Sequence, residues 1–188
     1  FIGYDISKAS SGTTIDTVLD GALLQGKKIQ CVVAGHNHFD YNCMTDGMIP
    51  VVNTDCDTRQ SKQWPMTIGT KNEQSFDVVT IDYTNKTIIC RRIGRGKSRI
   101  IHYDKKTLAI GNTLDISSLL EIVPTSYSIR DNNSLQYRNA AGGGTGVTFG
   151  NTKASIASGV VTPISEGLII AVAENDDCIE TFNIKIES

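Results

Sequence analysis

Short runs of strand-forming residues, separated by turn residues, constrain the fold of this chain more than any other feature. Residues 76–82 and 86–91 flank Tyr83-Thr84-Asn85, which is the pattern of a β-hairpin. Further runs follow at a similar rhythm, at 114–116, 126–129, 160–162, 168–173 and 181–186. Because short strands at this spacing are typical of sandwiches, the later part of the chain is predicted to be a small all-β sandwich.

The earlier part of the chain has a different pattern. Apolar side chains recur at helical spacing from Ile15 to Leu23, and Gly26 can end that helix. Residues 29–34 form a short apolar run that suits a buried strand, which leads directly into Gly35. A helix, a buried strand and a loop in this order predict an α/β unit.

Charge also divides the chain. Residues 1–105 carry 13 basic and 11 acidic side chains, whereas residues 106–188 carry 5 and 9. We therefore predict two domains, 1–105 and 106–188, which sit close together because no long Gly/Ser-rich or Pro-rich linker separates them.

Composition excludes several classes of protein. The net charge of -2 argues against a generally basic nucleic-acid binder. No run of about 18 apolar residues is present, so we expect no membrane span. The five cysteines form no CxxC pair and are odd in number, which favours reduced thiols over a disulfide scaffold.

Two histidines carry the clearest chemical signal. His36 and His38 are separated by one residue, directly after the predicted buried strand, and Gly35 frees the backbone there. Imidazole nitrogens bind Zn, Fe and Mn ions, and loops at the carboxyl ends of buried strands commonly hold ligands. The alternative is that these are surface or capping histidines.

The surrounding sequence resembles a known family. Val32-Val33-Ala34-Gly35-His36-Asn37-His38 is similar to the last metal motif, G-H-x-H, of calcineurin-like metallophosphoesterases. Residues 49–54, 69–82 and 93–99 resemble the strand and terminal hairpin that follow this motif in bacterial and phage-borne members. The resemblance implies that His36 and His38 each bind one ion of a dinuclear Mn, Fe or Zn centre. Asn37 lies between the two histidines and could contact a substrate phosphate.

The resemblance is incomplete. The family also has an Asp-x-His motif, a Gly-Asp motif with a bridging Asp, an Asn-His pair and a further His before G-H-x-H, and this chain contains none of them. His102 comes after the family-like region. We therefore expect a C-terminal fragment whose partner is the missing N-terminal segment, with no catalytic residue of its own and little or no activity alone.

Other polar residues near the motif have simpler interpretations. Asp40, Asp46, Asp55 and Asp57 could supply oxygen ligands, but Asp more often stands in turns and caps. Trp64 and Tyr41 could edge a cleft or serve only in packing. The basic run Arg91 to Arg99 suggests phosphate-rich partners. Against this, alternation in the hairpin strand predicts that the Arg91 charge faces solvent, the net charge is negative, and no aromatics are interleaved for base stacking.

Residues 152–167 resemble the late strands of bacterial immunoglobulin-like domains of the group 2 type. This resemblance implies an all-β sandwich that acts as a spacer or binds a glycan or protein ligand, on a secreted, cell-surface or virion protein. Asn175-Asp176-Asp177 could recruit Ca²⁺, although an acidic turn without spaced ligands is more often simply solvated.

Two functional hypotheses follow. In the first, the chain is a fragment of a metal-dependent phosphoesterase, combining a partial α/β metallophosphoesterase sandwich with an immunoglobulin-like sandwich. In the alternative, it is a non-catalytic surface or phage structural module that retains a remnant phosphoesterase half.

Overall fold

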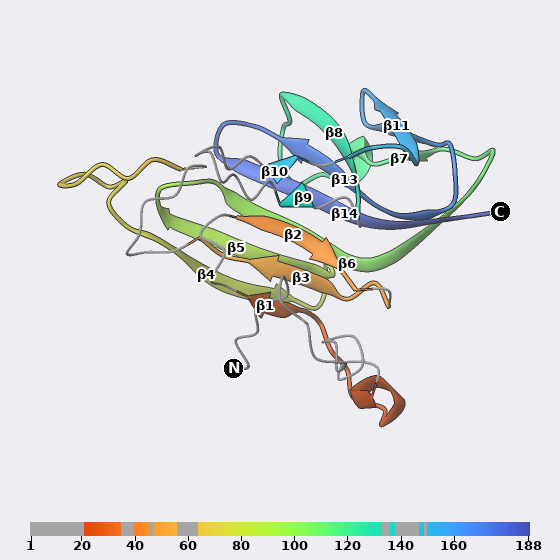
Figure 1. Cartoon of the computed structure of the whole chain (residues 1–188), viewed down its shortest axis with the longest axis horizontal. Helices are drawn as coiled ribbons and strands as arrows, with labels where there is room; N and C mark the ends of the chain where they lie inside the picture. The colour runs from red at the N-terminus through yellow and green to blue at the C-terminus, as the bar shows by residue number, and fades with distance from the viewer. Residues whose placement is uncertain are drawn as a thin grey trace. The chain divides into compact units, whose positions relative to one another are not determined.

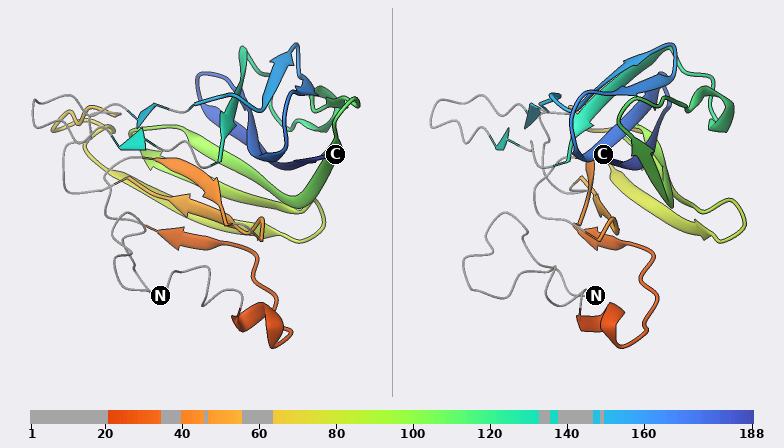
Figure 2. Two further views of the ribbon diagram at one scale, coloured as in Figure 1. Left: turned by 45° about the vertical axis from the view of Figure 1, so that its right-hand side comes forward. Right: turned by 90° about the vertical axis from the view of Figure 1, so that its right-hand side faces the viewer.

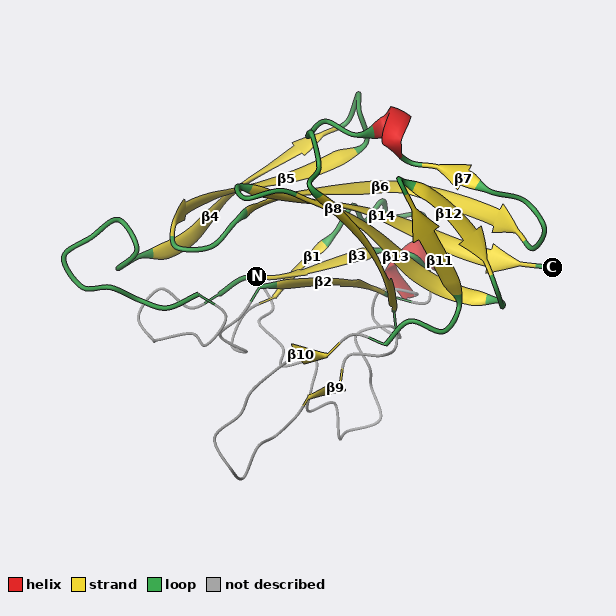
Figure 3. Ribbon diagram, turned by 90° about the horizontal axis from the view of Figure 1, so that it is seen from above, coloured by secondary structure: helices red, strands yellow, loops and turns green. Residues whose placement is uncertain are grey.

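Strands dominate the computed structural model, which describes residues 21–34, 40–45, 47–55, 64–132, 136–137, 147–148 and 150–188. Helical structure in this part of the chain is limited to one turn at 21–24 and the 3-10 helix η2 (Ser117–Leu119), drawn in red in Figure 3. The chain folds into two compact units. The first unit contains the described residues up to Val79 together with Arg91–Gly96, and the second contains Thr80–Cys90 and Lys97–Ser188.

The first unit contains a three-stranded sheet in the order β1-β3-β2 (Figure 1). β1 (Val32–Ala34) is parallel to β3 (Pro50–Asn53), and β3 is antiparallel to β2 (Tyr41–Met44). All four residues of β3 are buried, as expected for the central strand of a sheet. The predicted strand at 29–34 is confirmed over its last three residues.

The predicted hairpin is confirmed as β4 (Ser75–Asp82) and β5 (Thr87–Gly94). Its turn is held by the Asp82 carboxylate, which accepts hydrogen bonds from the backbone N–H groups of Thr84 (2.8 Å) and Asn85 (3.0 Å). These donors lower the pKa of Asp82, led by the Asn85 N–H. Lys86 then reverses the chain with a φ of 59°.

The largest sheet among the described residues has six strands. β5, β6 (Ser98–Ala109), β14 (Cys178–Glu187), β13 (Gly167–Glu174) and β8 (Ser126–Asp131) are successive neighbours in a sheet that ends on its other side at β4. β6 and β14 are parallel, with a register shift between Phe182 and Ile184, and β13 lies beside β14 in antiparallel pairing (Figures 1 and 2).

A smaller sheet closes the second unit. It has the order β11-β12-β7, made of Ala154–Ala157, Val160–Pro163 and Leu114–Asp115. A further two-stranded pair joins β9 (Gln136–Tyr137) and β10 (Val147–Thr148).

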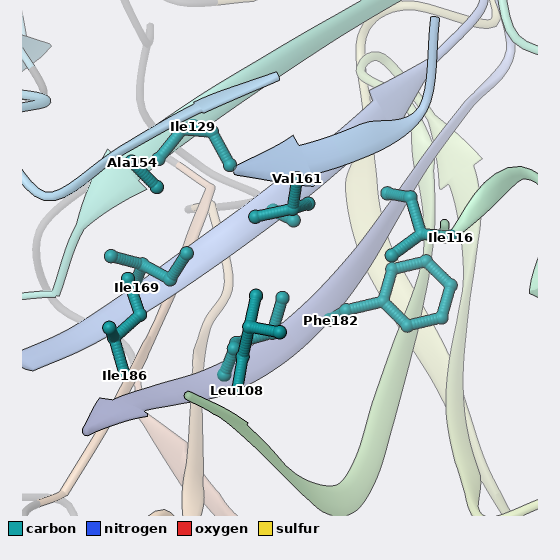
Figure 4. Close-up of a cluster of buried hydrophobic side chains, with 10 residues drawn as sticks. Leu108, Ile116, Ile129, Ala154, Val161, Ile169, Phe182 and Ile186 are labelled. Atoms are coloured by element: carbon teal, nitrogen blue, oxygen red, sulfur yellow. The ribbon is translucent and has the colours of Figure 1, made fainter. Parts of the chain in front are cut away.

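One apolar core lies between the two larger sheets of the second unit (Figure 4). Ile116 and Val161 come from the β7 and β12 side, and Ile169, Phe182 and Ile184 come from the opposite sheet; all five are fully buried. Burying an Ile or Phe side chain stabilises the fold by about 1.5–3 kcal/mol, so this cluster is a main source of stability. Its two-layer arrangement is consistent with the predicted β-sandwich.

One part of the predicted fold is not shown by the structure. An α/β architecture is not seen in the described residues, where the helical turn at 21–24 is all that is described of the helix predicted from Ile15 to Leu23. A short buried strand has the same apolar pattern in a parallel α/β sheet and in a mixed sheet, so that pattern could not separate them. The predicted domain limit at 105/106 stays a prediction; residues 105 and 106 lie within β6.

Candidate functional site

The predicted metal ligands lie outside the described residues: this applies to His36 and His38, and to Asn37 between them. The structure does describe the frame on either side of this motif. β1 ends at Ala34, whose carbonyl oxygen accepts a hydrogen bond from the backbone N–H of Thr54 at 3.0 Å. Because β1 and β3 are parallel, their carboxyl ends meet at one edge, and the motif begins there.

Asp40, which follows the motif, is buried in a charge cluster. Its carboxylate accepts hydrogen bonds from the Arg92 guanidinium at 2.5 Å, from the Trp64 indole N–H at 2.8 Å and from the backbone N–H of Asp55 at 3.0 Å. Arg92 also donates to Asp77, with Nε to Oδ1 at 2.9 Å and Nη2 to Oδ2 at 3.1 Å. The side chains of Arg92, Asp40 and Asp77 are only 2%, 3% and 2% exposed.

The same cluster extends through a second arginine. Arg95 Nε lies 3.4 Å from Asp55 Oδ2, and Arg95 Nη1 donates to the Glu73 carbonyl oxygen at 2.7 Å. Arg92 Nη1 donates to the Arg95 carbonyl oxygen at 2.9 Å and to the Ser75 hydroxyl at 2.8 Å. The two arginines and three aspartates therefore form one connected network in the first unit.

Glycines make this network possible. Gly94 has a φ of 94°, and a Cβ there would lie 1.9 Å from the Gln74 carbonyl oxygen. Gly96 has a φ of 97°, and a Cβ there would lie 2.5 Å from Arg92 Nη1 and 3.2 Å from Asp40 Oδ2. The Gly-Arg-Gly sequence noted in the family-like region thus has a local physical reason: only glycine fits beside the buried guanidinium.

The prediction that the Arg91 charge faces solvent is confirmed, whereas three other arginines of the basic run are buried. Arg91 is exposed, but Arg92, Arg95 and Arg99 are 8%, 2% and 1% exposed. Burial by itself lowers the pKa of Arg92, but hydrogen bonds and charges from Asp77 and Asp40 raise it well above its ordinary value. The guanidinium groups of Arg92 and Arg95 are internal partners of carboxylates, which leaves them poorly placed to bind an external phosphate.

The aspartates considered as possible ligands separate into two groups. Asp40 and Asp55 are buried and bonded to Arg92 and Arg95, a structural role that the turn interpretation missed. Asp46 and Asp57 lie outside the described residues. The described part of the chain contains no group of three or more His, Cys, Asp or Glu side chains placed to hold a metal ion.

A second polar site lies in the second unit, and the sequence interpretation gave it no role. His102 Nε2 lies 2.6 Å from Glu180 Oε1, and the His102 ring stacks on Phe182 with centroids 4.1 Å apart at 14°. The Glu180 side chain is fully buried. It accepts further hydrogen bonds from the backbone N–H groups of Glu121 (2.9 and 3.1 Å) and Ile122 (3.1 Å).

This pair borders a cavity of 310 Å³ lined by Asn85, His102, Asp104, Lys106, Leu119 and Glu121. The signal that could have located it is the run His102-Tyr103-Asp104-Lys105-Lys106. In a strand, alternate residues share a face, so His102, Asp104 and Lys106 line the cavity together. What the sequence could not show is Glu180, which is 78 positions away from His102.

Two other polar features have structural roles. Asn175 Oδ1 accepts hydrogen bonds from the backbone N–H groups of Asp177 (3.0 Å) and Cys178 (2.9 Å), so this residue serves the turn before β14. Cys31, Cys43, Cys90 and Cys178 are reduced cysteines, as predicted, and Cys56 lies outside the described residues.

Comparison with known proteins adds no relative: no family model, no curated protein and no solved structure matches this chain. Within the described residues, no helix has the length and apolar character needed to cross a membrane.

Proposed function

We propose that this chain is the C-terminal part of a calcineurin-like metallophosphoesterase, joined to a bacterial immunoglobulin-like sandwich. One observation carries the proposal: the G-H-x-H sequence starts where β1 ends, beside the parallel strand β3. Asp40 supports it from the other side, because the buried Arg92 guanidinium anchors the chain directly after the motif. A segment whose two flanking residues are fixed by the fold is suited to present two imidazoles together.

The donors in this chain are too few to complete a dinuclear centre. His36 and His38 would supply one nitrogen each, but the nearest described carboxylates, Asp40 and Asp55, already bind arginines. When bound, two ions would supply a hydroxide nucleophile and stabilise the phosphoryl oxygens. In this proposal the histidines act only as ligands, Asn37 contacts the phosphoester, and the remaining ligands come from an N-terminal segment.

The proposal predicts that the 188-residue chain alone is inactive. We expect no metal-dependent hydrolysis of an aryl phosphate ester by the purified chain in Mn²⁺, Fe³⁺ or Zn²⁺, and no effect of His36→Ala on that background. Substantial turnover that His36→Ala abolishes would overturn the fragment hypothesis.

The family assignment has a separate test. The gene region encoding the residues before Phe1 is expected to contain Asp-x-His and Asn-His motifs. Co-expression of that segment with this chain is then expected to restore turnover, and His36→Ala or His38→Ala to remove it. An upstream sequence without these motifs would contradict the enzyme hypothesis.

The second unit favours the alternative hypothesis, a binding module on a secreted, cell-surface or virion protein. The observation that supports this alternative is the apolar core in Figure 4, because all the residues of that core belong to the second unit. Saturable binding of a defined glycan or protein by the whole chain, retained in a His36→Ala/His38→Ala variant, would support this alternative. Loss of that binding in the double variant would contradict it.

A further inference from the structure

We propose that the cavity beside His102 is a binding site for one neutral sugar residue of a glycan. This inference rests on the alternative hypothesis of a binding module, whose ligand it narrows, and it does not depend on the phosphoesterase proposal. Three observations carry it: a buried histidine with an unpartnered ring nitrogen, the mixture of donors and acceptors around the cavity, and the balance of their charges.

His102 is held in place at the wall of the cavity. Its Nε2 lies 2.6 Å from Glu180 Oε1, its ring stacks on Phe182, and its side chain is only 10% exposed. The other ring nitrogen, Nδ1, has no hydrogen-bond partner in the part of the chain that the structure describes. It is not one of the unpartnered polar atoms that are fully enclosed, so it keeps accessible surface. Because His102 lines the cavity, a group inside the cavity can pair with Nδ1.

A hydroxyl is the ligand group that suits this nitrogen. In an imidazolium ring both nitrogens donate, whereas in a neutral ring with its proton on Nε2 the Nδ1 atom accepts. A hydroxyl donates one hydrogen bond and accepts others, so it pairs with Nδ1 in either state of the His102 ring. An ammonium group only donates and a carboxylate only accepts, so each of them suits one state alone. The contact with Nδ1 therefore favours a hydroxyl whatever the protonation state of His102.

The other polar groups of the lining also suit hydroxyls. Lys106 Nζ donates to Asp104 Oδ2 at 2.6 Å, and because an ammonium group has three N–H donors, two remain without a partner among the described groups. The exposed Glu121 adds a carboxylate that only accepts. Asp104 Oδ1 is fully enclosed and takes no part in binding. Since donors and acceptors both line the cavity, neighbouring hydroxyls on one ligand can satisfy both kinds.

The charges around the cavity favour a neutral ligand. Lys106 is paired with Asp104, and the buried Glu180 is paired with His102. The charge that remains is that of Glu121, which repels an anion and, because its exposed carboxylate is screened by water, attracts a cation only weakly. A metal ion does not fit, because no three His, Cys, Asp or Glu side chains in the described residues are placed to coordinate one.

The size of the cavity and its apolar edge set the length of the ligand. A volume of 310 Å³ is at the lower end for small-molecule sites, which suits one sugar ring better than a longer oligosaccharide. Leu119 lines the cavity with an apolar side chain, against which the C–H face of such a ring can pack. We therefore expect a monosaccharide, or the terminal residue of a glycan, to be the bound unit.

The test uses the whole chain and the methyl glycosides of D-glucose, D-galactose and D-mannose. The chain has only three histidines, so long-range ¹H–¹⁵N spectra of the imidazole rings are simple, and His102→Gln assigns the His102 signals. At least one glycoside is expected to shift the His102 ring saturably, with a dissociation constant of about 10 mM or below, as for a small ligand with few polar contacts. Tetrahydropyran, which has the ring without the hydroxyls, is expected to cause no such shift. Glucosamine and glucuronate, which carry opposite charges, are expected to bind no more tightly than the best glycoside.

Matched lysine variants separate the cavity from general effects of charge. Lys106→Met keeps the methylene stem but removes the N–H donors, and it is expected to weaken binding about fivefold, the effect of losing one hydrogen bond. Lys105→Met removes the same charge from the neighbouring residue of β6, which is exposed and does not line the cavity, and it is expected to leave binding unchanged. Glu121→Ala removes an acceptor at an exposed position with little risk to folding, and a loss of about fivefold is expected there too.

Three results would overturn the proposal. The first is a His102 signal that stays unchanged with all of the glycosides up to about 100 mM, well above the expected dissociation constant. The second is any result that removes the need for hydroxyl recognition: an equal shift with tetrahydropyran, an equal loss of affinity in Lys106→Met and Lys105→Met, or glucosamine or glucuronate binding more than about tenfold tighter than every glycoside. The third is saturation transfer from the chain to a glycoside while the His102 ring is unaffected. That third result would refute this cavity as the site but leave the binding-module hypothesis standing.

Discussion

Replacing Arg92 by Met tests the buried charge cluster that contains Asp40 and Asp77. Met keeps much of the side-chain volume but removes the guanidinium, so Asp40 and Asp77 stay buried without their shared cation. Removing one partner of a buried pair costs about 3–5 kcal/mol, and we expect a loss in that range. With a typical urea slope of about 2 kcal/mol per M, the unfolding midpoint falls by about 2 M.

The assay is the fluorescence of Trp64, the single tryptophan of the chain. Its indole N–H donates to Asp40, so it reports on the first unit where the cluster lies. Arg91→Met is the matched control, because Arg91 is the neighbouring exposed arginine and its loss is expected to cost within about 0.5 kcal/mol.

A double variant sharpens this test. In Arg92→Met/Asp40→Asn one orphaned carboxylate becomes neutral, so we expect part of the lost stability to return, with a coupling energy of about 2 kcal/mol. The reasoning would be refuted by a loss below about 1 kcal/mol for Arg92→Met. It would equally be refuted by a loss no larger than that of Arg91→Met.

Three further predictions concern the backbone at Gly96, the core residue Phe182 and the thiol of Cys178. Gly96→Ala is expected to destabilise the first unit more than Gly69→Ala, because both have positive φ but only a Cβ at Gly96 meets other atoms; Trp64 unfolding curves compare the two. Phe182→Ala is expected to cost the second unit about 3–5 kcal/mol in calorimetry, and a cost below about 1 kcal/mol would contradict its core position. Burial of the Cys178 thiol, followed by the negative charge of Glu180, raises the pKa of Cys178 to about 11. Alkylation of Cys178 at pH 8 should therefore be at least about a hundredfold slower in the folded chain than in the urea-unfolded chain. The neutral thiol also contributes stability below the unfolded pKa of about 8.5, and this contribution should fall as the pH rises toward 11.

Much of the strand layout could be predicted from local patterns. The hairpin around Tyr83 and the runs that became β8, β12, β13 and β14 were each marked by alternating or apolar residues between turn residues. These signals survive because strand formation and turn chemistry depend on residues close in the sequence. The pairing of the strands had no such local mark, and the parallel β6–β14 contact joins distant segments.

The candidate sites show the same division. His36 and His38 stand out by spacing alone, whereas the partner of Asp40 is Arg92, 52 positions away. Alternation correctly predicted that Arg91 faces solvent, but it could not show that the opposite face, which carries Arg92, is covered. Buried carboxylates from distant parts of the chain form ion pairs with Arg92 and Arg95.

The sequence by itself determined where strands and turns form, which residues are apolar enough to build the core around Phe182, and where two imidazoles stand together. Only the tertiary structure decided which polar groups lose contact with water. It brings Arg92 to Asp40 and His102 to Glu180. The physical reason is that the free energy of a charge depends on its dielectric surroundings and on the partners that folding provides, and neither is a property of the local sequence.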